Sequence, residues 1–112
     1  MGGLAALYAH LARPESFGGA LCLSPSFWFG GGEILRWAER QPSPPLSRVY
    51  LDCGTKEGGG RMVGLVERMA SLFGARGYGP KQLMWRPDRR GAHAESHWRR
   101  RLPKALRFMF RV

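Results

Sequence analysis

Three short apolar runs that alternate with helical segments constrain the fold of this 112-residue chain more than any other feature. The runs are bounded by glycine, proline and serine, which is typical of buried strands. Strands joined by helices of this length need right-handed crossovers, and these produce a parallel sheet with helices on both faces. The expected strands cover residues 17–23, 49–53 and 82–85, and the expected helices cover residues 4–11, 33–40, 62–76 and 94–110.

The length allows one domain and excludes two, so residues 1–112 are expected to form a single α/β unit. Pro103 lies inside the last predicted helix, where it removes a backbone hydrogen bond. We therefore expect that helix to be strained at Pro103, or to break near Leu102 and restart with Pro103 in its first turn.

The net charge of +10, from 18 basic and 8 acidic residues, raises the question of a nucleic-acid partner. The arginines are spread over every segment, and the alternation of aromatic and basic residues that is typical of RNA-binding proteins is missing from the sequence. We expect no nucleic-acid partner. We also expect the run Arg99-Arg100-Arg101 to lie on the solvent-exposed side of the last helix.

The sequence shows neither a membrane span nor a signal peptide. No apolar run approaches the roughly 20 residues that a helix needs to cross a bilayer. The first apolar stretch has no basic region before it, as a signal peptide would. We therefore expect a cytoplasmic protein without a membrane partner.

The sequence predicts neither a disulfide nor a metal site. Cys22 and Cys53 lie in apolar runs outside any C-x-x-C pair, so both are expected to be buried and reduced. His93 and His97 are four residues apart, but Glu95 does not occupy the position that an H-E-x-x-H zinc motif requires. We expect no metal and no cofactor.

Residues with chemical potential follow each predicted strand. In parallel α/β sheets, functional groups gather in the loops at the carboxyl ends of the strands. The loop 24–32 holds Phe27 and Trp28, the loop 54–60 holds Glu57, and the loop 87–93 ends at His93. The chain itself opens with Met1-Gly2-Gly3 before a helix, which resembles the part of a G-x-S-x-G nucleophile elbow that follows the serine.

Four motifs occur in order along the chain: Met1-Gly2-Gly3-Leu4, Ser24-Pro25-Ser26-Phe27-Trp28, Leu51-Asp52-Cys53-Gly54-Thr55-Lys56-Glu57, and Gly91-Ala92-His93-Ala94-Glu95 with Trp98 and Leu102-Pro103. Together they resemble the α/β-hydrolase family called Putative esterase, which includes enterochelin and feruloyl esterases and relatives of S-formylglutathione hydrolase. The similarity spans essentially the whole chain and corresponds to the second half of the family's domain.

The resemblance implies a role for five residues. His93 would be the histidine of a catalytic triad and Glu57 its acid. Phe27 and Trp28 would border the pocket for the substrate, and the backbone nitrogen of Met1 would contribute to the oxyanion hole. The nucleophilic serine and its strand would precede Met1, so we expect a carboxylic-ester hydrolase whose nucleophile is not in this chain. The chain alone is expected to be inactive.

Several alternatives remain open from the sequence. Asp52 or Asp88 could be the triad acid, and Glu57 a solvated turn residue. His93 could cap the last helix, and Trp28 could be a core residue. Another serine could also act as nucleophile, and Ser24 and Ser26 are the first to test.

At the level of function, there are two rival interpretations. The first is a non-catalytic remnant or interaction module, and the second, less favoured, is a basic nucleic-acid-binding domain that uses the cluster Arg99–Arg101. A sheet of this size leaves a strand edge unpaired, which we place at residues 20–23, and such an edge promotes self-association.

Overall fold

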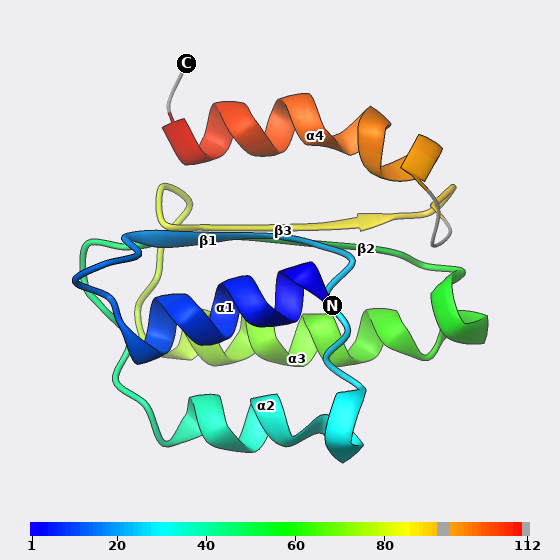
Figure 1. The fold of residues 1–112 in the computed structure, drawn as a ribbon. Helices are drawn as coiled ribbons and strands as arrows, with labels where there is room; N and C mark the ends of the chain where they lie inside the picture. Colours follow the sequence, from blue (N-terminus) through cyan, green and yellow to red (C-terminus); the bar gives the residue numbers. More distant parts are fainter. Residues whose placement is uncertain (92–94, 111–112) are drawn as a thin grey trace.

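The computed structural model describes residues 1–91 and 95–110. Figure 1 shows a sheet with one helix above it and the other helices below. The elements follow one another as α1 (Gly2–Ala12), β1 (Gly19–Leu23), α2 (Phe29–Glu39), β2 (Arg48–Gly54), the 3-10 helix η1 (Glu57–Gly60), α3 (Met62–Ala75), β3 (Leu83–Asp88) and α4 (Glu95–Phe110).

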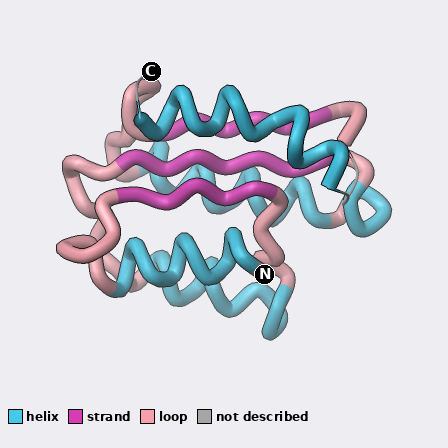
Figure 2. Tube along the Cα trace, turned by 45° about the horizontal axis from the view of Figure 1, so that its top comes forward, coloured by secondary structure: helices cyan, strands magenta, loops and turns pink. Residues whose placement is uncertain are grey.

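The three strands form a parallel sheet in the order β1-β2-β3, which confirms the predicted α/β architecture. Tyr50 of β2 is opposite Leu21 of β1 and Met84 of β3, so β2 is the central strand. Helix α4 covers one face of the sheet, while α1 and α3 cover the other (Figures 1 and 2). Helix α2 lies outside α1 and α3, away from the sheet.

The central strand separates two environments. Val49, Leu51 and Cys53 belong to the hydrophobic core that the sheet forms with α1 and α3. Alternate residues of a strand point to opposite faces. Tyr50 and Asp52 therefore face α4, where the Tyr50 ring lies 6.4 Å from the ring of Phe108. The polar residues of the sheet are thus collected on the α4 side.

Several element bounds differ from their predictions by a few residues, and two of the differences affect the site. Strand β3 continues to Asp88, three residues beyond the predicted end, because Arg86 and Asp88 pair in register with Asp52 and Gly54 of β2. Helix α4 runs without a break through Pro103, so the predicted break near Leu102 is wrong. Ala105, on the same helix, is fully buried, and its packing keeps the chain helical beyond the proline.

The start of α2 shows how glycine shapes the loop after β1. Gly30, Gly31 and Gly32 have φ values of 62°, 70° and 79°, which side-chain-bearing residues rarely adopt. Regular right-handed helix therefore begins at Glu33, as predicted.

Within residues 1–91 and 95–110, no helix is long and apolar enough to cross a membrane.

Candidate functional site

Polar groups from all three strands meet at the carboxyl edge of the sheet, as parallel α/β topology predicts. Ser24 directly follows β1, Asp52 lies near the end of β2, and Glu57 begins η1. Asp88 ends β3, and Arg101 reaches the group from α4. The predicted histidine, His93, lies outside the described residues.

Glu57 is buried, with only 2% of its surface exposed, so it is not a solvated turn residue. Its Oε2 accepts a hydrogen bond from the backbone N–H of Gly54 at 2.7 Å and another from the Ser24 hydroxyl at 2.6 Å. Hydrogen bonds to an ionised group are stronger than those between neutral groups. The carboxylate is therefore held in one orientation at the end of β2.

Ser24 uses the whole hydrogen-bonding capacity of its hydroxyl. The hydroxyl donates to Glu57 and accepts from Trp98 Nε1 at 3.1 Å and from Arg101 Nη2 at 2.8 Å. A serine hydroxyl has one proton and two lone pairs, so these three contacts saturate it. An activated nucleophile gives its proton to a base, whereas the Ser24 proton is directed at the acid Glu57.

Ser26 is buried as well. Its Oγ accepts a hydrogen bond from the Met1 ammonium group at 3.3 Å. The Met1 side chain itself is exposed.

Arg101 is buried, with its side chain only 3% exposed, so the prediction that it lies on the exposed side of the helix is wrong. Its Nε lies 3.2 Å from Asp52 Oδ2, and its Nη1 lies 3.4 Å from Asp88 Oδ2. Residues 98, 101, 105 and 108 share one face of an α-helix, and here that face is turned to the sheet. Arg99 and Arg100 are exposed, as predicted. The helical spacing was a signal that could have identified Arg101.

The two aspartates are held by other partners. Asp52 Oδ1 accepts from the backbone N–H of Ser24 at 3.0 Å, and Oδ2 accepts from the Tyr50 hydroxyl at 2.8 Å. Burial raises the pKa of Asp52 above its ordinary value, although the nearby Arg101 opposes the shift.

Asp88 shows the opposite balance. Its Oδ2 accepts from Arg100 at 2.8 Å, and its Oδ1 accepts from the backbone N–H of Arg90 at 3.1 Å. Burial acts to raise the pKa of Asp88. The hydrogen bonds from Arg100 and Arg90, together with the charges of Arg100 and Arg101, outweigh it, so the pKa is lowered.

The cysteines are free and buried, as predicted. Burial, reinforced by the charge of Glu57, raises the pKa of Cys53 to about 12. Burial and the charge of Asp52 also raise the pKa of Cys22. Both thiols are therefore protonated near neutrality and are poor nucleophiles. Among the described residues, no group of three His, Cys, Asp or Glu could hold a metal ion.

The two aromatic residues predicted at the substrate pocket have different surroundings. Phe27 is a core residue, whereas Trp28 is 52% exposed and is not part of the core. Trp28 lines a hollow of about 420 Å³ together with Gly58 and Met62, just beyond Glu57 in sequence. Of the two, Trp28 is accessible to a bound molecule.

A second hollow, of about 310 Å³, lies beside the free edge of β1. It is lined by Met1, Gly2 and Gly3 at the start of α1, by Leu21 and Leu23 of β1, and by Ser24 and Trp98. A Cβ at Gly3 would lie 2.9 Å from Pro25 Cβ, so only glycine allows α1 to begin this close to the loop. Because Leu23 and Ser24 at the end of β1 line the hollow, it lies at the carboxyl edge of the sheet.

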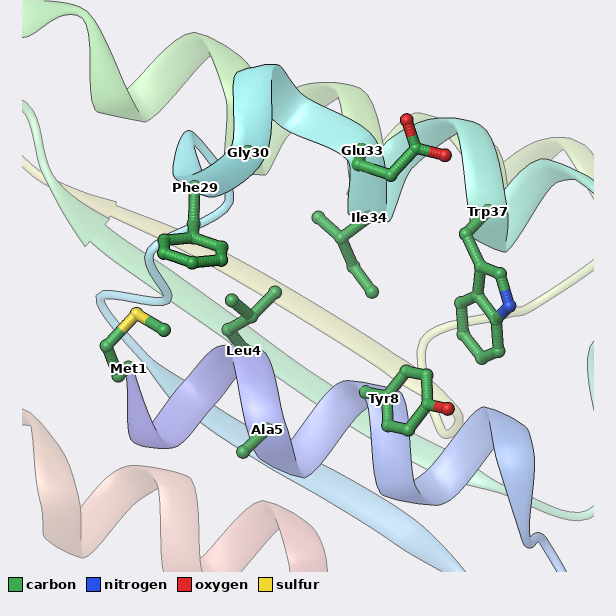
Figure 3. Close-up of a pocket in the computed structure, with 9 residues that line it drawn as sticks. All are labelled: Met1, Leu4, Ala5, Tyr8, Phe29, Gly30, Glu33, Ile34 and Trp37. Carbon is green, nitrogen blue, oxygen red and sulfur yellow. The ribbon is translucent and has the colours of Figure 1, made fainter.

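A larger groove, of about 680 Å³, separates α1 from α2 (Figure 3). Its walls are apolar and include Leu4, Tyr8, Phe29, Ile34 and Trp37. The Tyr8 and Trp37 rings lie 4.8 Å apart at one end. Glu33 at the rim is paired with Arg36 and Arg40. The groove offers apolar contact surface rather than groups for chemistry.

A parallel sheet with helices on both faces and a polar group at its carboxyl edge defines an α/β protein with a candidate site where this class of fold places one. The chain matches the family described as Putative esterase over residues 1–109, and it belongs to this family. The predicted family resemblance is thereby confirmed.

The structure is similar to that of the enterobactin esterase FES from Shigella flexneri, crystallised in the presence of 2,3-Di-hydroxy-N-benzoyl-glycine. The two share 28% sequence identity, with a TM-score of 0.77. The similarity covers 97% of this chain and 29% of the esterase chain. No curated protein matches the chain.

Proposed function

We propose that this chain supplies the acid and the base of a serine esterase, with Glu57 as the acid and His93 as the base. In this proposal the nucleophilic serine precedes Met1. Family membership and the similarity to an enterobactin esterase support the reaction class. The observation that carries the proposal is the buried Glu57 carboxylate, oriented by Gly54 and Ser24 at the end of β2.

The surroundings of the three acids favour Glu57 over the aspartates. Both oxygens of Asp52 are engaged by Ser24, Tyr50 and Arg101, and the pKa of Asp52 is raised. Asp88 is bound to exposed Arg100. Glu57 lies beyond the strand end, and its Oε2 is occupied by Gly54 and Ser24. A carboxylate held in this orientation beyond the strand end is suited to keep a histidine in the required tautomer.

The hollow beside β1 is where we place the serine. A nucleophile elbow runs from a strand, through a sharp turn, into a helix. Helix α1 begins at Gly2, and the hollow lies between its first residues and the end of β1. A serine joined to Met1 would therefore enter next to Ser24 and Trp98, on the same edge as Glu57.

In the proposed mechanism the serine attacks a carboxylic ester while His93 takes its proton. Glu57 stabilises the resulting imidazolium, which gives its proton to the departing alcohol and leaves an acyl-serine. Water, deprotonated by His93, then hydrolyses the acyl-serine to a carboxylic acid and the free serine. Backbone N–H groups, with that of Met1 among them, would stabilise the oxyanion. Half-exposed Trp28 would border the substrate, whereas Phe27 would support the loop from within the core. This mechanism needs no metal or cofactor.

The test compares this chain with a version extended by the segment that precedes Met1 and ends in Gly-x-Ser. We expect trace turnover of a p-nitrophenyl ester by the 112-residue chain and strong turnover by the extended chain. Replacing the added serine by alanine, or His93→Ala, should lower kcat by roughly 10⁴-fold or more. Glu57→Gln should have a large effect as well, because the histidine loses its partner.

Two results would contradict the proposal. Strong turnover by the 112-residue chain that vanishes with His93→Ala would mean that the nucleophile lies within residues 1–112. An extended chain that folds, as judged by circular dichroism, yet hydrolyses none of a panel of esters would exclude the esterase function.

A further inference from the structure

We infer that Ser24 is a positioning residue whose hydroxyl fixes the orientation of the Glu57 carboxylate. The inference rests on the proposed function, in which Glu57 is the triad acid. It assigns to Ser24 a role other than nucleophile. It also explains why Ser24, at the end of β1, donates a hydrogen bond to Glu57, which follows β2.

The hydrogen bonds around Ser24 have a defined direction. Trp98 and Arg101 both donate to Ser24 Oγ from α4, and neither nitrogen can accept the serine proton in return. The hydroxyl proton is therefore directed away from α4, to Glu57 Oε2 at 2.6 Å. The two α4 side chains thus orient the hydroxyl, and the hydroxyl orients the acid.

The backbone of Ser24 is consistent with a positioning role. Its φ of 46° makes it the one non-glycine residue with positive φ among those that the structure describes. Such conformations persist where the surrounding structure imposes them, and they concentrate at functional sites. Here the Ser24 N–H is held by Asp52, through Oδ1 at 3.0 Å and the backbone oxygen at 3.2 Å.

The consequence concerns the freedom of the acid. Gly54 and Ser24 together restrain Oε2 of Glu57, so the other oxygen has a fixed direction. Without the Ser24 hydroxyl, Oε2 would lose one of its two short hydrogen bonds and would keep that from Gly54 and the longer contact with Cys53 Sγ at 3.8 Å. The carboxylate would then be held less firmly in this orientation and would stabilise the protonated His93 less.

The test is an NMR titration of His93 in the 112-residue chain, with its signals assigned through His93→Gln. A carboxylate partner raises a histidine pKa by about 1–3 above the ordinary value of about 6.5. Glu57→Gln should remove this increase. Ser24→Ala and Ser24→Gly should each remove at least half of it, and should weaken the low-field imidazole N–H signal of His93.

The variants are chosen to separate the hydroxyl from the backbone. Glycine accepts a φ of 46° without strain, so Ser24→Gly removes the hydroxyl while favouring the native backbone. Glu67→Gln is the matched control. It alters a carboxylate at an exposed position of α3, outside the group at the carboxyl edge of the sheet, and it should leave the His93 pKa nearly unchanged.

The outcomes distinguish the role of Glu57 as the triad acid from the role of Ser24 as its positioning residue. If Glu57→Gln lowers the His93 pKa and neither Ser24 variant does, the inference is wrong while Glu57 remains the acid. If Glu57→Gln has no effect, both the proposed acid and the inference are wrong. Should the Ser24 variants fail to fold, Trp98→Phe removes one donor to Ser24 Oγ. It should lower the His93 pKa by a smaller amount, and the absence of any decrease would overturn the inference.

Discussion

At the scale of single residues, Arg101 is the side chain whose environment departs most from expectation. Its guanidinium lies beside Asp52 and Asp88, and its Nη2 is 4.0 Å from Glu57 Oε2. A buried ion costs several kcal/mol to desolvate unless partners of opposite charge compensate it. Arg101 and the acids around it therefore stabilise one another across the carboxyl edge of the sheet.

We predict that Arg101→Met destabilises the protein by about 3–5 kcal/mol, because it leaves Asp52 buried without its cation. Urea unfolding followed by circular dichroism measures the change. Arg99→Met, at an exposed position of the same helix, should change stability by less than about 0.5 kcal/mol.

A double variant tests the physical reason. Adding Asp52→Asn to Arg101→Met removes the uncompensated negative charge, so it should restore part of the lost stability. Equal effects of Arg101→Met and Arg99→Met would show that the buried ion pair contributes nothing.

At the scale of elements, the site depends on how closely the end of β2 approaches the turn after β3. Gly54 pairs with Asp88, and a Cβ at Gly54 would overlap the backbone of Gly91. The same Gly54 donates its N–H to Glu57. The absence of a side chain at Gly54 allows the end of β2 to lie against Gly91 in the turn after β3.

We predict that Gly54→Ala destabilises the protein by about 1–3 kcal/mol or more, because the rigid backbone of Gly91 must move. Gly64→Ala is the matched control in α3, where nothing lies within 4 Å of the added carbon. It should stabilise the protein by about 0.5–1 kcal/mol through helix propensity. Thermal unfolding compares the two, and a neutral Gly54→Ala would contradict the close approach.

At the scale of the whole molecule, both edges of the described sheet are open, because β1 and β3 each pair with β2 alone. In the described part of the chain, β1 pairs with β2 alone, which agrees with the predicted open edge at residues 20–23. Large apolar side chains are also exposed on α4, at Leu102, Leu106 and Phe110. Unpaired strand edges and exposed apolar surface both promote association.

We therefore predict that the 112-residue chain self-associates through β1 as its concentration rises. Light scattering coupled to gel filtration should show a mass that increases with concentration. Leu21→Lys places a charge beside the open edge and should reduce the association. Leu46→Lys, at a position that is 95% exposed elsewhere, should not. A monomer at all concentrations would contradict the prediction.

The alternation of apolar runs and helices was sufficient to predict the parallel sheet, because hydrophobic period and connection length act locally along the chain. The same reasoning placed Glu57 at the carboxyl end of β2. Sequence alone could not extend β3 to Asp88, since that extension depends on pairing with β2. It also could not predict that α4 continues through Pro103, where tertiary packing outweighs local propensity.

The amino-acid sequence by itself determined the class of fold, the family and the edge of the sheet where polar groups collect. Only the tertiary structure decided what those groups bind. Ser24 accepts hydrogen bonds from Trp98 and Arg101, which are 74 and 77 residues away in the sequence. The orientation of α4 about its axis exposes Arg99 and Arg100 to solvent and buries Arg101. Local patterns set the period of each element, whereas the buried hydrogen bonds depend on how the elements pack.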